Sequence, residues 1–198
     1  MKPLSLKISL VMAALSLSVA SVMAETPCHS LGQGESAEKS DNVIARFQAW
    51  SVFVETNPDE CFAAANPLKT TIEPATALEN LCRGALGLTV SYWPEEGVNG
   101  QLAFQSGYEF DPSVTVEFII DEKSYPLITE AGGKVAWPDN ASEDRKLVSA
   151  MRRGSQVTIT GRSSSGFNVK DTYTLSGFAS AVDLAAQTCS YVLAEMGQ

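Results

Sequence analysis

Four short segments of this chain alternate apolar and polar residues with a period of two. Apolar side chains occupy every second position in 50–54, 88–92, 114–120 and 157–159, and mostly polar residues stand between them. Successive side chains of a strand point to opposite faces, so the pattern is typical of strands buried on one face. Gly, Pro, Asn and Asp separate the segments. The spacing therefore predicts an all-β fold, a two-sheet antiparallel β-sandwich.

Two segments have helical spacing instead and predict two helices. The first covers about 140–153, with Asn140 as N-cap, Glu143 three residues later, and Gly154 expected to end the helix in the left-handed conformation. The second covers about 178–193, where apolar residues three and four positions apart share one face. These residues are Phe178, Val182, Ala185, Cys189 and Val192.

The first 24 residues have the pattern of a secretory signal peptide. Lys2 and Lys7 flank the start of an apolar run, and Val22-Met23-Ala24 has small residues at the two positions that a signal peptidase reads. The run is too short to cross a hydrocarbon layer of ~30 Å. We therefore expect cleavage after Ala24, export to the periplasm or the medium, a polar arm over 25–45, and a single domain over 46–198 without a membrane span.

The charge of the chain limits the classes of partner. Without Lys2 and Lys7, 12 of the 14 Lys and Arg remain against 23 Asp and Glu, so the net charge changes from −9 to −11. Such an acidic balance argues against nucleic acid and anionic lipid as main partners, and it is compatible with a basic partner.

Four cysteines follow the leader: Cys28, Cys61, Cys82 and Cys189. An exported protein can hold cysteines as disulfides, and four cysteines allow three pairings. Cys189 lies on the apolar face of the second helix and Cys61 opens an apolar segment, so we predict Cys61–Cys189 and Cys28–Cys82. No metal is expected, because Cys28-His29 has no second close pair of ligands.

Several further segments occur in a characteristic order. They are Arg46–Val52, Cys61, Met151–Gly154, the strand-like 157–161, Ser176–Ala181 and Cys189. In this order they resemble the invasion-associated locus B family of exported bacterial proteins. The resemblance implies an exported β-sandwich-like protein, linked in some members to host-cell invasion, and it supplies no catalytic residues. It also implies that the partner is a protein or another component of the envelope or host surface. Many members carry a cysteine shortly after the tryptophan. This chain has Phe53-Val54-Glu55 there, which is one reason to pair Cys61 with a distant cysteine.

Residues in catalytic arrangements are scarce. The single histidine, His29, stands in the polar arm, and Ser36-x-x-Lys39 lacks the Lys-Thr-Gly strand that its chemistry requires. Carboxylate doublets would serve a hydrolase where folding brings two carboxyls together across a cleft. We expect no enzyme and no cofactor; a glycan-directed hydrolase and a periplasmic small-ligand carrier are the alternatives. The doublets are Glu95-Glu96, Asp121-Glu122 and Glu143-Asp144.

Cations gather in one part of this acidic chain. Five of them lie within 145–162, and the hydroxyl-rich Ser163–Gly166 follows. Guanidinium groups bind carboxylates and phosphates through paired hydrogen bonds. The alternative is the ordinary preference of cations for a helix C-terminus. The candidate residues for binding an anion or a partner are Arg145, Arg152, Arg153 and Arg162, with Lys146 beside them.

Overall fold

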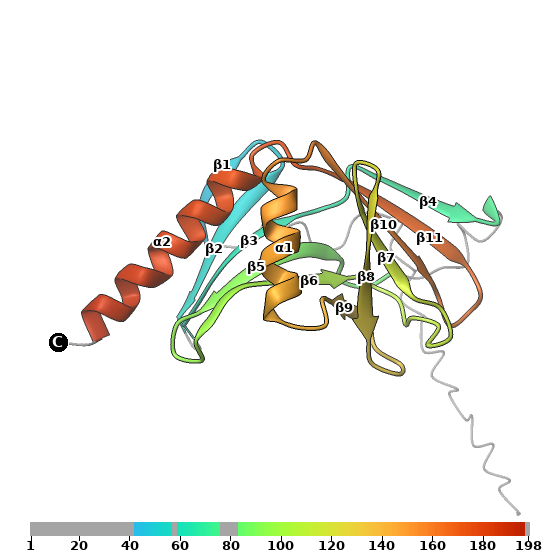
Figure 1. Cartoon of the computed structure of the whole chain (residues 1–198), viewed down its shortest axis with the longest axis horizontal. Helices are drawn as coiled ribbons and strands as arrows, with labels where there is room; N and C mark the ends of the chain where they lie inside the picture. Colours follow the sequence, from blue (N-terminus) through green and yellow to red (C-terminus); the bar gives the residue numbers. More distant parts are fainter. Residues whose placement is uncertain (1–41, 57–58, 76–82, 197–198) are drawn as a thin grey trace, which may run out of the picture.

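A computed structural model of the chain describes residues 42–56, 59–75 and 83–196, which form eleven strands and two helices (Figure 1). The expected leader, His29, Ser36, Lys39 and the Cys28–Cys82 pair lie outside the described residues. The elements are β1 (Val43–Phe47), β2 (Trp50–Thr56), β3 (Asp59–Ala65), β4 (Lys69–Glu73), β5 (Gly87–Trp93), β6 (Val98–Gln105), β7 (Val116–Ile120), β8 (Lys123–Thr129), β9 (Val135–Trp137), α1 (Ala141–Met151), β10 (Gln156–Arg162), β11 (Asn168–Thr174) and α2 (Phe178–Met196).

The predicted strands correspond to β2, β5, β7 and β10. In β7 the alternation is visible directly, because Val116, Phe118 and Ile120 are buried while Glu117 is exposed. β7 begins two residues later than its apolar pattern, and Val114 is 39% exposed. At the other end of the chain, β1 begins at Val43, inside the segment that we expected to be a polar arm. The all-β class is confirmed.

All strands join one antiparallel sheet in the order β1-β2-β3-β5-β6-β9-β8-β7-β10-β11-β4. β8 connects the two halves, since it pairs with β9 on one side and with β7 on the other. The halves nevertheless face each other: the rings of Phe104 on β6 and Tyr173 on β11 lie 6.5 Å apart between centroids. Trp50 on β2 also donates a hydrogen bond to the carbonyl of Thr174 at 3.0 Å. The two layers of the predicted sandwich are thus halves of one sheet that folds over its own core.

α2 covers the half of the sheet that contains β2 and β3 (Figure 1). Its buried face carries Phe178, Val182, Ala185 and Cys189, as the spacing predicts. Phe178 packs edge-on against Trp50, with the ring centroids 4.8 Å apart. The predicted Cys61–Cys189 disulfide is present and joins α2 to β3 across a sequence separation of 128 residues. A loop of that size corresponds to about 4–5 kcal/mol in the chain-entropy description.

α1 packs on β6, and its N-terminus has the predicted cap. Asn140 Oδ1 accepts hydrogen bonds from the backbone N–H groups of Ser142 and Glu143, at 3.0 and 3.2 Å. The prediction of a left-handed cap at Gly154 is wrong, because this glycine has no positive φ. It serves packing instead: a Cβ there would lie 2.7 Å from Ile120 Cγ2, so any other residue would force the neighbouring side chains to move.

A buried ion pair lies between the two halves of the sheet. Arg83 and Asp171 form two parallel hydrogen bonds of 2.9 and 2.7 Å, and both side chains are 1% exposed. The guanidinium also donates twice to the carbonyl of Ser106, at 2.8 and 2.6 Å, and lies 5.4 Å from the Tyr108 ring centroid. The charges therefore have partners on several sides, as buried charges require.

Candidate anion-binding surface

The exposed face of α1 carries a row of cations and hydroxyls. A helix advances 3.6 residues per turn, so Ser142, Arg145, Lys146, Ser149 and Arg153 fall on one side of α1 and its C-terminal extension. The opposite side is buried against β6 and carries Asp144, Leu147 and Met151. Because this side of α1 is buried, the row of cations and hydroxyls on the other side faces the solvent.

β8 supplies the other wall of a shallow groove. Lys123 and Tyr125 lie across from α1, and the open hollow between them has a volume of about 400 Å³. The Lys123 ammonium lies 5.0 Å from the centroid of the half-buried Tyr125 ring, which is within the range of a cation–π contact. We call this hollow the basic groove; it is lined by Lys123, Arg145, Lys146 and Arg153 with Tyr125, Ser142 and Ser149.

The cations of the basic groove have few partners within the described part of the chain. Lys146 forms an ion pair of 2.5 Å with Glu143, in which both side chains are at least 40% exposed. Arg153 donates to Ser149 Oγ at 2.7 Å. Arg145 has no hydrogen bond or ion pair among the described residues. Of the four cations that line the groove, only Lys146 forms an ion pair with a carboxylate among the described residues. This is notable in a chain whose net charge is −9.

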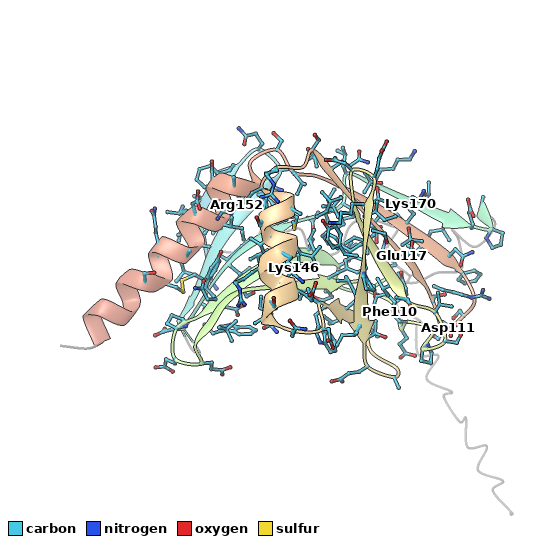
Figure 2. The ribbon with its side chains drawn as sticks, viewed as in Figure 1. Phe110, Asp111, Glu117, Lys146, Arg152 and Lys170 are labelled. Carbon is cyan, nitrogen blue, oxygen red and sulfur yellow. A yellow bond between two sulfur atoms is a disulfide. The ribbon has the colours of Figure 1, made fainter. Side chains whose placement is uncertain are left out.

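The structure divides the four arginines of the sequence prediction. Arg145 and Arg153 line the basic groove. Arg152 lies at the end of α1 next to α2 (Figure 2) and pairs with Asp183 at 2.7 Å. Arg162 ends β10 and lies 3.5 Å from Asp111. Adjacent helical residues point about 100° apart, which explains why Arg152 and Arg153 serve different neighbours.

Lys123 and Tyr125 were not found from the sequence. They stand about 20 residues before α1 along the chain, in a strand whose sequence does not indicate a neighbouring helix. The helical spacing of Arg145 and Arg153, in contrast, was readable and would have separated them from Arg152. The turn 163–166 forms local hydrogen bonds: Ser163 Oγ accepts from the Phe167 N–H, and the Gly166 N–H donates to the Ser163 carbonyl.

Two of the three carboxylate doublets contain an acid that accepts hydrogen bonds from the backbone of another element. Asp144 is buried, and its Oδ1 accepts a hydrogen bond of 2.9 Å from the backbone of Leu102 on β6. Burial raises the pKa of Asp144, against the smaller opposing effects of this hydrogen bond and of Arg145. Asp121 accepts from the N–H groups of Ser155 and Gln156 at 3.2 and 3.3 Å. These acids hold α1 and β10 in place.

A second hollow of about 330 Å³ lies beside the disulfide, between α2 and the β5–β6 turn. Tyr92, Val98, Ala186 and Cys189 contribute to its walls, and none of its lining residues is charged. Within the described ranges, no cluster of three or more His, Cys, Asp or Glu side chains is suitable for a metal ion. The basic groove is therefore the better candidate, because charge provides a means of selecting a ligand.

Together, the antiparallel sheet, the two helices and the disulfide define a β-sandwich-like, disulfide-linked protein. The chain belongs to the invasion associated locus B (IalB) protein family, whose sequence profile matches residues 50–186. This confirms the resemblance noted in the sequence.

Among solved structures, the chain is similar to the crystal structure of invasion associated protein b from Bartonella henselae. The two are 16% identical, the alignment covers 73% of this chain and 96% of that one, and the TM-score is 0.45. No curated protein matches the chain. None of the helices in the described ranges has the length and apolar character that a membrane crossing needs.

Proposed function

We propose that this protein is an exported, non-enzymatic binding protein of the bacterial cell envelope, and that the basic groove is its contact surface. The single observation that carries the proposal is the gathering of Lys123, Arg145, Lys146 and Arg153 around one hollow of a strongly acidic protein. Exposed cations concentrated on one face attract anionic groups, while the remaining surface repels them.

Export is supported by the signal-peptide pattern of residues 1–24 and by the disulfide. The Cys61–Cys189 bond is buried and joins two distant elements, as is common in proteins of oxidising compartments. Membership of the invasion-associated locus B family agrees with this location. The partner that fits these features is an anionic component of the envelope or of a host surface.

A binding assay on isolated cell envelopes tests the proposal. The chain from Glu25 onward is compared with an Arg145→Glu/Arg153→Glu variant, and we expect the variant to lose most of the envelope-bound fraction. Lys134→Glu/Lys170→Glu is the matched control, because it changes the net charge equally at exposed positions outside the groove. Equal binding by both variants and the parent would contradict the proposal.

Fractionation of the native cell tests the location separately. We expect the protein in the periplasm or the medium, beginning at Glu25 and without free thiols. A cytoplasmic protein that retains Met1 and titrates with four thiols would rule out export.

A further inference from the structure

We propose that the ligand of the basic groove is an anionic glycan, a sugar chain that carries repeated sulfate, phosphate or carboxylate groups. This inference rests on the proposed function and names the ligand class for the same surface. The observation behind it is the ordered alternation of cations and hydroxyls along the exposed face of α1.

The spacing of the cations favours an extended ligand over a single small anion. Arg145 and Arg153 are eight residues apart, which separates them by about 12 Å along a helix axis at 1.5 Å per residue. Lys146 lies between them, and Lys123 contributes from β8. A ligand that satisfies both ends must carry at least two separated anionic groups.

Neutral donors alternate with these cations. Ser142 precedes Arg145, and Ser149 stands between Lys146 and Arg153. A serine hydroxyl both donates and accepts, so it can pair with a sugar hydroxyl, whereas ammonium and guanidinium groups only donate. The half-buried Tyr125 ring adds a flat apolar surface at the wall of the groove. Charged, hydroxyl and apolar groups in one groove match the surface of an anionic sugar.

The groove is held in shape before a ligand arrives. Asn140 caps α1, the Asp144–Leu102 hydrogen bond fixes the helix to β6, and Ser149 orients Arg153 through a 2.7 Å bond. Preorganised side chains lose less conformational entropy on binding. The groove is shallow and lined by exposed cations, so a chain can lie along it and exchange readily with water and salt.

Titration of the purified chain from Glu25 with defined oligosaccharides tests the proposal. The probes are a heparin hexasaccharide, an alginate hexasaccharide, a phosphorylated mannan oligosaccharide and uncharged dextran of equal length. We expect at least one charged probe to bind and dextran not to bind; the charged probe that binds best identifies the anionic group. Inorganic phosphate should bind at least about tenfold more weakly, because it reaches one end of the groove and a factor of ten corresponds to about 1.4 kcal/mol.

Matched variants assign the binding to the groove. Arg145→Gln/Arg153→Gln should weaken the best probe by about tenfold or more, given the strength of hydrogen bonds to charged groups. Lys134→Gln/Lys170→Gln should leave it unchanged. Ser142→Ala should weaken the glycan and spare a poly-glutamate peptide, which lacks sugar hydroxyls; Ser149 is left in place because it orients Arg153. Circular dichroism and thermal unfolding establish that each variant is folded.

The outcomes separate this inference from the proposed function. Groove-dependent binding to envelopes without binding to any charged glycan would overturn the glycan assignment and leave the proposed function standing. Poly-glutamate binding as tightly as the glycans would also overturn it, in favour of an acidic protein partner. Loss of groove dependence in both assays would overturn the two proposals together.

Discussion

Three arginines of this protein lie in two contrasting regions. Arg83 lies between the halves of the sheet at 1% side-chain exposure and makes hydrogen bonds with Asp171 and the Ser106 carbonyl. Arg145 on α1 and Arg153, just after the end of α1, are exposed to solvent. Burial disfavours the charge of Arg83, but the hydrogen bonds and the attraction of Asp171 outweigh it and raise the pKa of Arg83. The same type of residue therefore stabilises the fold in one region and is free to contact a ligand in the other.

The polar surroundings of Arg83 reinforce this difference. Burial, and then the nearby charge of Asp171, raise the pKa of both Tyr108 and Tyr173, so both phenols stay neutral at physiological pH. Gly161 leaves room for this cluster, since a Cβ there would lie 2.8 Å from the Tyr108 hydroxyl. A buried charge must have its partners built into the fold, whereas a charge in water needs none.

The largest effect should come from breaking the buried pair. Arg83→Met leaves Asp171 charged and without its main partner, so we expect the free energy of unfolding to fall by about 3–5 kcal/mol in urea denaturation. The double variant Arg83→Met/Asp171→Leu removes both charges and should be less destabilised than Arg83→Met alone. A loss below about 1 kcal/mol for Arg83→Met, within the range of surface pairs, would remove the distinction between the two regions.

Removing the disulfide tests how much the covalent link contributes to the free energy of unfolding, beside the buried Arg83–Asp171 pair. We expect Cys61→Ala/Cys189→Ala to lower the free energy of unfolding by about 2–5 kcal/mol, because the reduced chain regains the entropy of a large loop. Denaturant unfolding of the variant, beside the reduced and oxidised parent, measures it. Agreement between the variant and the oxidised parent would show that α2 is held by packing alone.

Asp144 stands on the boundary, since it is buried on the helix whose other face forms the basic groove. Asp144→Ala leaves the Leu102 N–H without its acceptor and should cost about 1–3 kcal/mol. Asp144→Asn keeps an acceptor oxygen and removes the buried charge, so it should be at least as stable as the parent at pH 7.

The difference in stability between Asp144→Asn and the parent should depend on pH in a definite direction. The pKa of Asp144 is raised in the folded state, so its protonated form favours folding, and the contribution is lost as the pH rises through the folded pKa. The advantage of Asp144→Asn over the parent should therefore shrink as the pH falls from 7 to below 4. Unfolding free energies measured across that range provide the check, and an advantage that grows on acidification would contradict the assignment.

The smallest effect should come from the groove itself. Arg145→Gln/Arg153→Gln removes two exposed charges, and we expect the free energy of unfolding to change by less than about 0.5 kcal/mol. Thermal or urea unfolding measures it. A loss comparable to that of Arg83→Met would mean that these arginines stabilise the fold instead of facing a ligand.

Much of the architecture could be predicted from local patterns. The alternation in β5 and β7, the Asn140 cap and the apolar face of α2 each depend on residues within a few positions of one another. The pairing of Cys61 with Cys189 followed from the same patterns, because each cysteine lies on a face that must be buried. Gly154 was misjudged because its requirement comes from Ile120, a contact that no local pattern contains.

The sequence by itself determined the period of four strands, the two helices, the family and the gathering of cations along α1, because these depend on neighbours along the chain. Tertiary structure decided that the strands form one folded sheet, that Arg83 meets Asp171, and that Lys123 and Tyr125 complete the basic groove. Those features join residues from distant strands, and their positions follow from how the sheet closes over its core.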